Sequence, residues 1–209
     1  MSQSPHDVEG FVLAGGQSSR MGRDKALVRV ADRPLVEWAL EVLHGAGLTS
    51  RIAGARGKLD EFAPVIADEA VGAGPLSGVC SALRQTAAEW AVFVPVDLPL
   101  IPGSLIQFLI GHAETTGRAA TIVSLNGFAQ TFPAVVRRDA LGALWAELEA
   151  GRRGCFAAFS RAGASVVPVE MVAQTGQVSD GRGLWPYRWF WNVNTTAELE
   201  RLELSMKAG

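Results

Sequence analysis

A stretch rich in glycine and serine, ending in cationic residues, follows an apolar run near the N-terminus. Residues 11–13 (Phe-Val-Leu) have the composition of a buried strand, and residues 14–25 read Ala-Gly-Gly-Gln-Ser-Ser-Arg-Met-Gly-Arg-Asp-Lys. Glycines let a backbone approach a ligand closely and turn its N–H groups towards it. Arg20 and Lys25 add charges that suit the phosphates of a nucleoside triphosphate. The stretch therefore predicts a nucleotide-binding loop.

This loop differs from the two commonest nucleotide-binding motifs. A P-loop requires glycine, four residues and then Gly-Lys-Ser/Thr, whereas Lys25 follows Asp24 and precedes Ala26. The Gly-x-Gly-x-x-Gly fingerprint of dinucleotide-binding folds is also absent from the loop sequence. A glycine pair such as Gly15-Gly16 suits an ordinary turn after a strand, so the nearby cations carry the phosphate assignment.

Two aspartates are candidates for the oxygen ligands of the divalent cation that accompanies a triphosphate. Asp97 follows the apolar run 90–95 and lies among prolines, at the expected carboxyl edge of a sheet. A turn or helix-capping aspartate is the alternative interpretation of Asp97. Asp68 precedes a glycine-rich turn at 72–78 that could bring backbone groups against a base or ribose; a surface acid beside Glu69 is equally consistent with its sequence.

Composition narrows the class of protein. The chain has 209 residues, is 48% hydrophobic and has a positive mean hydropathy, which fits one α/β domain over residues 1–209 with its core at about 8–205. The formal charge of −2 gives no reason to expect nucleic acid as a partner. Apolar runs stay under a dozen residues and no export signal is recognisable, so we expect no membrane span and a cytoplasmic protein. Cys80 and Cys155 lack metal-type spacing and are expected to pack in the core.

Short apolar segments alternate with amphipathic ones along the chain. We expect strands at 10–13, near 52, and at 63–66, 90–95, 119–124, 132–137 and 165–169. We expect helices at 34–43, after a turn that starts at 75, and at 101–112, 141–150, 155–159 and 197–204, with a surface loop at 174–188. Runs buried on both faces that alternate with helices predict a three-layer α/β fold, Rossmann-like, with a mostly parallel sheet. Ligands bind such sheets over the carboxyl ends of the strands, where the glycine-rich loop emerges.

The C-terminal part carries two asparagines and several tryptophans. Asn192 and Asn194 point the same way if their segment is extended, and paired amides suit hydrogen bonds to a sugar, phosphate or heterocycle. Asn194 or Thr195 could cap the following helix, with Glu198 near its third position. Three of the six tryptophans fall within 185–191, where they either stack on a flat heterocycle or pack in the core or an interface.

Taken together, these motifs resemble those of the molybdenum cofactor guanylyltransferase family. The matching segments are 13–25, 74–78, 96–99 with 101–102, and 192–195, with weaker matches at 130–135 and 151–153. The resemblance implies a nucleotidyltransferase fold. It implies an enzyme that joins the GMP part of GTP to the terminal phosphate of molybdopterin and releases pyrophosphate with Mg²⁺. It further suggests as partners a GTP-binding adaptor or the recipient molybdenum enzymes.

The resemblance also assigns roles to individual residues. Arg20, Lys25 and Asp97 would form the catalytic set, with Asp97 as the metal ligand. The residues implied to bind GTP or molybdopterin are Leu13, Ala14, Gly15, Gly16, Lys25, Asp68, Asp97, Asn192 and Asn194. The two asparagines would fall in the pterin-binding region, with Arg152 or Arg153 as additional candidates. Where the family often has an asparagine, this chain has Ala53, which can offer only its backbone.

Three other functions are compatible with parts of this pattern. Cytidylyltransferases on the same fold tend to show Leu-Ala-Ala-Gly and a proline before the lysine, where this chain has Gly15 and Asp24. Sugar-phosphate nucleotidyltransferases usually continue towards Gly-Thr-Arg-Leu, unlike residues 18–21. A non-catalytic nucleotide- or cofactor-binding adaptor could lose its charged residues, and the presence of Arg20, Lys25 and Asp97 argues against it.

Overall fold

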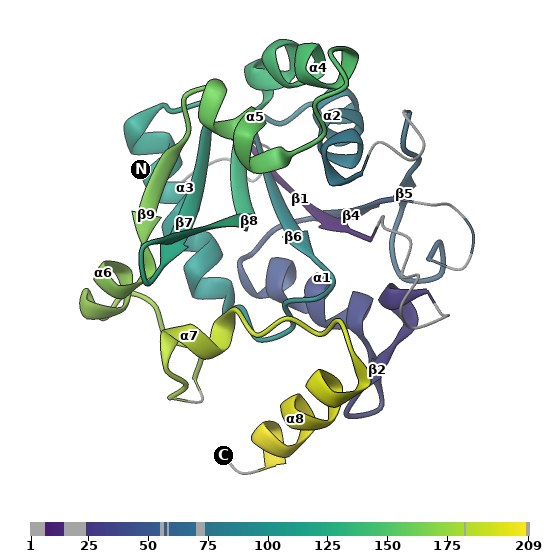
Figure 1. The fold of residues 1–209 in the computed structure, drawn as a ribbon, viewed down its shortest axis with the longest axis vertical. Helices are drawn as coiled ribbons and strands as arrows, with labels where there is room; N and C mark the ends of the chain where they lie inside the picture. The colour runs from purple at the N-terminus through teal and green to yellow at the C-terminus, as the bar shows by residue number, and fades with distance from the viewer. Residues whose placement is uncertain are drawn as a thin grey trace.

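A seven-stranded sheet forms the middle layer of the protein (Figure 1). The computed structural model describes residues 7–14, 24–54, 57, 59–69, 74–181 and 183–207. The strands lie in the order β5-β4-β1-β6-β8-β7-β9, and β8 is antiparallel to both of its neighbours while the other pairs are parallel. Their bounds are β1 Val8–Leu13, β4 Ser50–Ala53, β5 Val65–Ile66, β6 Trp90–Pro95, β7 Ala120–Leu125, β8 Phe128–Arg137 and β9 Ser165–Pro168. The predicted α/β class with a mostly parallel sheet is confirmed.

Helices cover both faces of this sheet (Figure 1). One face packs on α1 (Leu35–Gly45) and α3 (Gly103–Thr116), and the other on α2 (Pro75–Gln85), α4 (Leu141–Glu149) and α5 (Cys155–Arg161). Successive side chains of a strand point to opposite faces, so the central strands serve both cores. Val12 and Val94 belong to the first core, whereas Phe11 and Phe93 stack in the second, with ring centroids 5.5 Å apart.

The two cysteines lie within the second core. Cys80 and Cys155 are buried and free, and burial raises the pKa of each thiol to about 12. A thiol of that pKa stays protonated at neutral pH, which makes it a poor nucleophile and metal ligand. The expectation that both cysteines pack in the core is confirmed.

Several short elements were not expected from the sequence. A hairpin of β2 (Arg29–Val30) and β3 (Arg33–Pro34) precedes α1, and its turn residues, Ala31 and Asp32, have positive φ angles of 47° and 61°. The helix α6 (Val169–Gln174) begins where a strand was expected to end, and α7 (Pro186–Trp189) is one turn long. None of the helices in the described part of the chain is long and apolar enough to cross a membrane.

The loop between α6 and α7 is held against the first turn of α3. The Ser104 hydroxyl donates to the Ser179 carbonyl at 2.7 Å and accepts from the Ser179 N–H at 3.1 Å. The Asp180 carboxylate accepts from the N–H of Leu184 and from the indole Nε1 of Trp189. From α7 the chain crosses below the end of β6 and continues into α8 (Thr196–Lys207), which lies beside β2 (Figure 1).

The contact between α1 and α3 predicts different effects for alanine at two glycines of α3. A Cβ at Gly103 would lie 2.9 Å from the backbone carbon of Gly45, whereas one at Gly111 meets nothing within 4 Å. Because overpacking against backbone costs about 1–3 kcal/mol, Gly103→Ala should lower the free energy of unfolding by that amount. Gly111→Ala should leave it unchanged or raise it by about 0.5–1 kcal/mol through better helix propensity. Urea unfolding of both variants checks this, and equal midpoints would contradict the packing described.

Candidate active site

The carboxyl ends of four adjacent parallel strands meet at one edge of the sheet. Hydrogen bonds continue past the strand ends: Val96 N–H donates to the Leu13 carbonyl at 3.3 Å, and Ala14 N–H donates to the Ala53 carbonyl at 3.0 Å. The glycine-rich loop therefore leaves the centre of this edge, directly beside the segment that follows β6. Residues 15–23 of that loop, including Gly15, Gly16 and Arg20, lie outside the described residues.

Lys25 and Asp97 form an ion pair at this edge. Lys25 begins the 3₁₀ helix η1 (Lys25–Leu27), which Asp24 caps by accepting the Ala26 N–H at 3.1 Å. Lys25 Nζ lies 2.8 Å from Asp97 Oδ2, and the two side chains are only 19% and 25% exposed. Asp97 does not cap a helix, because the N-cap of α3 is Pro102, but it does lie in a turn after β6, as the alternative interpretation expected. The structure thus brings together two residues that the sequence singled out.

The C-terminal segment closes over this pair. Val193 N–H donates to the Asp97 carbonyl at 3.0 Å, and the Asn194 side-chain oxygen accepts a hydrogen bond from Lys25 Nζ. Asp97, Lys25 and Asn194 therefore lie together although they come from three distant parts of the chain. Sequence reasoning missed Val193, because a backbone donor leaves no signal in residue type.

A capping box holds this segment in place. The Glu198 carboxylate accepts from the backbone N–H groups of Asn194 and Thr195 at 2.8 and 2.9 Å, while the Thr195 hydroxyl accepts from Glu198 N–H at 3.2 Å. Such reciprocal bonds satisfy backbone donors at the start of a helix. Further along α8, Glu203 accepts the Ala31 N–H of the β2–β3 hairpin. The expected cap is confirmed, with Thr195 in the capping position.

Asp68 lies at the end of β5, on the other side of β1 from Asp97. Its Oδ1 is buried and has no hydrogen-bond partner among the described residues, and burial raises the pKa of this carboxyl above its ordinary value. A Cβ on Gly78 would lie 3.3 Å from that oxygen, so glycine leaves the room that the carboxylate needs. The neighbouring Glu69 pairs with Arg84, and Glu69 is therefore the structural acid of the two. An unpartnered, shielded carboxylate fits ligand binding better than a surface role.

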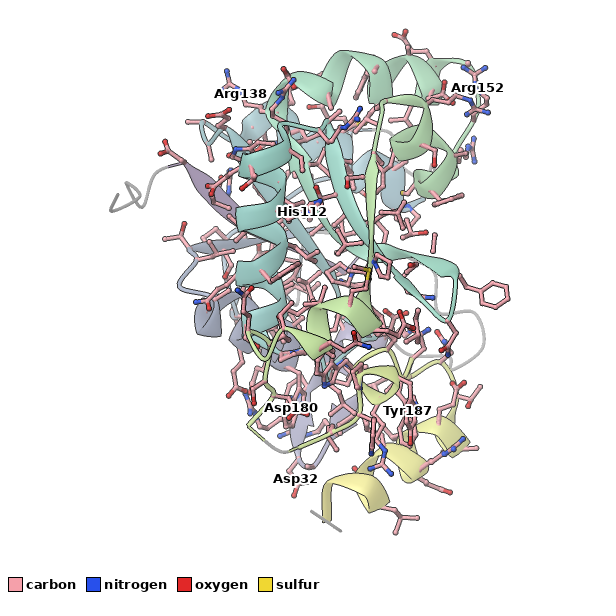
Figure 2. The ribbon with its side chains drawn as sticks, turned by 90° about the vertical axis from the view of Figure 1, so that its left-hand side faces the viewer. Asp32, His112, Arg138, Arg152, Asp180 and Tyr187 are labelled. Atoms are coloured by element: carbon pink, nitrogen blue, oxygen red, sulfur yellow. The ribbon has the colours of Figure 1, made fainter. Side chains whose placement is uncertain are left out.

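The remaining candidates fall into two groups. Asn192 is exposed and lines a hollow together with Val193 and Glu198, and no hydrogen bond joins it to Lys25 or Asp97 in the described residues. Arg152 is bound to Glu147 through both carboxylate oxygens, at 2.7 and 2.8 Å. Figure 2 shows Arg152 at the opposite end of the molecule from Tyr187, which precedes the C-terminal segment. Arg152 therefore serves the packing of α4 against α5.

The donor set at this edge suits a metal held jointly by protein and substrate. Within the described residues no group of three or more His, Cys, Asp or Glu side chains could hold a metal alone. Mg²⁺ is usually bound through one or two carboxylates, with phosphate oxygens and waters completing its shell. Asp97 supplies such a carboxylate beside a lysine that can neutralise phosphate charge. The arrangement can therefore handle a nucleoside triphosphate with a divalent cation.

Comparison with known proteins agrees with this geometry. Residues 10–166 match the family model described as MobA-like NTP transferase domain. A molybdenum cofactor guanylyltransferase of Shewanella loihica is 34% identical over 152 residues, which cover 70% of this chain and 77% of that protein. A probable molybdenum cofactor guanylyltransferase of Opitutus terrae is 34% identical over 159 residues, covering 73% and 78%.

The chain belongs to the molybdenum cofactor guanylyltransferase family. Members of this family are nucleotidyltransferases, and nucleotidyl transfer typically uses a divalent metal ion. The fold agrees: molybdopterin-guanine dinucleotide biosynthesis protein A from Archaeoglobus fulgidus superposes with a TM-score of 0.80 at 23% identity, over 96% of this chain and all of that one. A CMP:2-keto-3-deoxy-manno-octonic acid synthetase shares the fold with a TM-score of 0.66 at 13% identity, over 97% of this chain and 99% of that one.

In this guanylyltransferase-family chain, the carbonyl of Ala53 is already engaged by one hydrogen bond within the sheet. Its carbonyl accepts the Ala14 N–H, and its side chain is buried against the position of Gly78. The same hydrogen bond uses the Ala14 N–H, so this donor serves the sheet and not a ligand. Side-chain contacts with a nucleotide on this side are left to Asp68 and to the loop that begins at Leu13 and Ala14.

The capping box predicts a pH-dependent contribution of Glu198. Hydrogen bonds from Asn194 N–H and from Thr195 hold the pKa of the Glu198 carboxyl below its ordinary value. This stabilisation is present above the ordinary glutamate pKa of about 4.3 and is lost as the pH falls through the lowered value. Glu198→Gln should therefore unfold at lower urea than the wild type at pH 7, and the two should converge at pH 3. Glu200→Gln, on the same helix, is the control; a Glu198→Gln effect that is equal at both pH values would contradict the assignment.

Proposed function

We propose that this protein transfers GMP from GTP to the terminal phosphate of molybdopterin, giving the guanine dinucleotide form of the cofactor and pyrophosphate. The observation that carries the proposal is the Lys25–Asp97 pair at the carboxyl ends of β1 and β6, in a chain of the guanylyltransferase family. The names of the relatives support guanine as the base and the molybdenum cofactor as the acceptor.

The reaction needs no protein nucleophile. An oxygen of the acceptor phosphate attacks the α-phosphorus of GTP, forming one P–O bond while the bond between the α-phosphorus and the bridging oxygen breaks. The electron pair of the broken bond leaves with pyrophosphate. The chain contributes by positioning both substrates and neutralising developing charge. Lys25 is placed to bind phosphate, and Arg20, outside the described residues, is proposed for the same role.

The metal-binding role is assigned to Asp97, with Mg²⁺ as the proposed ion. Asp97 would hold the ion, whose positive charge would supply electrostatic stabilisation to the phosphates and to the leaving pyrophosphate. In this structure the ammonium of Lys25 lies on Asp97 Oδ2 and balances the charge of the carboxylate. The pair thus orients Asp97 at the edge of the sheet.

The two substrates are assigned to opposite sides of this pair. The nucleotide side comprises Asp68 and the loop that begins at Leu13 and Ala14 and continues through Gly15 and Gly16. The acceptor side comprises the C-terminal segment, where Asn194 contacts Lys25 and Asn192 lines the adjoining hollow. This division places the ion pair between the phosphates that react.

The direct test is pyrophosphate release by the purified protein with Mg²⁺ and molybdopterin, comparing GTP with CTP. Release with GTP, at least tenfold faster than with CTP, is expected. A preference for CTP would overturn the assignment of the base. Release with neither nucleotide, from protein that still binds GTP, would overturn the assignment of an enzyme and favour an adaptor.

Removing either charge of the ion pair should reduce turnover. Loss of one preorganised charge-stabilising group costs about 10²–10³-fold in rate, so Lys25→Ala and Asp97→Asn should each release pyrophosphate at least about a hundredfold more slowly. Asp139→Asn is the matched control, because Asp139 pairs with Arg137 beside Arg138 at the other end of the molecule (Figure 2). Circular dichroism should show all three variants folded. Near-normal turnover of a folded Lys25 or Asp97 variant would contradict the roles assigned to the pair.

A further inference from the structure

Two arginines lie over one tryptophan beside the candidate active site. The guanidinium carbons of Arg188, in α7, and Arg201, in α8, lie 5.3 and 4.7 Å from the ring centroid of Trp191. Tyr187 is labelled in Figure 2 at the lower end of the molecule, and the centroid of its ring lies 6.5 Å from the centroid of the Trp191 ring. The cluster therefore gathers two positive charges around a single indole.

These arginines differ from the other arginines that lie on aromatic rings. Arg33 over Trp38 pairs with Glu41, and Arg84 over Trp145 pairs with Glu69. In the part of the chain that the structure describes, no carboxylate lies within salt-bridge distance of Arg188 or Arg201. A ring holds the face of a guanidinium but leaves the N–H donors in its plane unpaired.

Arg188 carries the clearest sign of a missing partner. Its Nε is buried and has no hydrogen-bond partner in the part of the chain that the structure describes. Buried donors in proteins are almost always paired, so an unpaired one calls for an explanation. An anion bound at the Arg188 guanidinium would satisfy this donor and balance its charge.

The surroundings of the cluster connect it to the reacting groups. A hollow of about 240 Å³ adjoins it, lined by Phe190, Trp191, Asn192, Val193, Glu198, Arg201 and Leu202. Val193 donates its N–H to the Asp97 carbonyl, so this hollow begins next to the residue proposed to hold the metal. The nucleotide side marked by Asp68 lies at β5, which β4 and β1 separate from β6.

We propose that Arg188 and Arg201 bind the acceptor substrate, as a phosphate or other oxyanion carried on a flat heterocycle. The inference rests on the proposed function and adds to it the residues that select the acceptor. The hollow is smaller than the roughly 300–1,000 Å³ of a drug-sized site, which fits one ring system or one anionic group and not a complete nucleoside triphosphate. Arg188 and Arg201 act as binding residues for the acceptor, and the bond-forming steps are left to Lys25 and Asp97.

The test replaces each guanidinium by an apolar chain of similar length. Dissociation constants for molybdopterin and for GTP with Mg²⁺ are measured separately by anaerobic equilibrium dialysis, using Arg188→Met, Arg201→Met and the double variant. Since a charge-assisted hydrogen bond contributes about tenfold or more in binding, each single variant should bind molybdopterin about tenfold more weakly and the double variant about a hundredfold. The GTP constant should change less than twofold, and kcat at saturating molybdopterin should stay within twofold.

Arg33→Met is the matched control, because it removes a guanidinium that also lies on a tryptophan but is paired with carboxylates. It should leave both dissociation constants unchanged. Arg201 is exposed on α8, so Arg201→Met decides the question even if Arg188→Met does not fold.

The outcomes separate this inference from the proposed function. If the wild type binds molybdopterin and the arginine variants bind it more weakly, the acceptor site is supported. If the wild type at the same time releases no pyrophosphate from GTP, GMP transfer is overturned. Unchanged molybdopterin binding by folded Arg201→Met would overturn the acceptor site, and Arg201 would then only pack on the Trp191 ring. Loss of GTP binding in the same variant would also overturn it, because the phosphate bound there would be that of the nucleotide.

Discussion

Two parallel strands, β1 and β6, lie side by side in the sheet, and the candidate site depends on their pairing. Their register places the end of β1 at Leu13 opposite Pro95, so the glycine-rich loop and the segment that carries Asp97 leave the sheet together. Lys25 then returns to Asp97 across this edge, and Val193 attaches the C-terminal segment to the backbone of the same aspartate. A shift of either strand along the other would separate Lys25, Asp97 and the C-terminal segment.

The distribution of arginines separates structure from function. Arg51, Arg152 and Arg33 are paired with carboxylates and hold neighbouring elements together. Arg188 and Arg201 are held by the Trp191 ring and keep donors available. Because a buried polar donor without a partner is costly, the buried Arg188 Nε marks a place where an anionic ligand can contribute. The same reasoning applies to the buried Oδ1 of Asp68, an acceptor that has no hydrogen-bond partner among the described residues. It marks a place where a hydrogen-bond donor of a ligand can contribute.

Local patterns were enough to predict the main elements and several features of the site. The apolar run of β6 and the capping signal at Thr195 are each made by residues only a few positions apart in the sequence. The structure confirms both. The turn Asn126-Gly127 was overlooked, although an Asn-Gly pair is the usual signal of a tight hairpin and would have revealed that β8 runs antiparallel. The strands β2 and β3 have two residues each, too few for any periodicity.

Contacts between distant segments could not be predicted in the same way. Lys25 and Asn194 are 169 residues apart, and only the path of the C-terminal segment brings them together. The choice between a ligand-binding and a surface role for Asp68 also depends on burial, which arises from packing against α2 near Gly78. The role of Arg201 depends on the docking of α8, for which residue type alone gives no signal.

The most direct measurement of nucleotidyl transfer follows the fate of the phosphates of GTP. Purified protein, Mg²⁺ and molybdopterin are incubated with GTP labelled either at the α- or at the γ-phosphate, and products are separated by chromatography. If Lys25 and Asp97 support nucleotidyl transfer, the α-label enters the acceptor and the γ-label leaves as pyrophosphate, in equal amounts. Appearance of the γ-label in the acceptor or as inorganic phosphate, with the α-label remaining in GDP, would contradict that role.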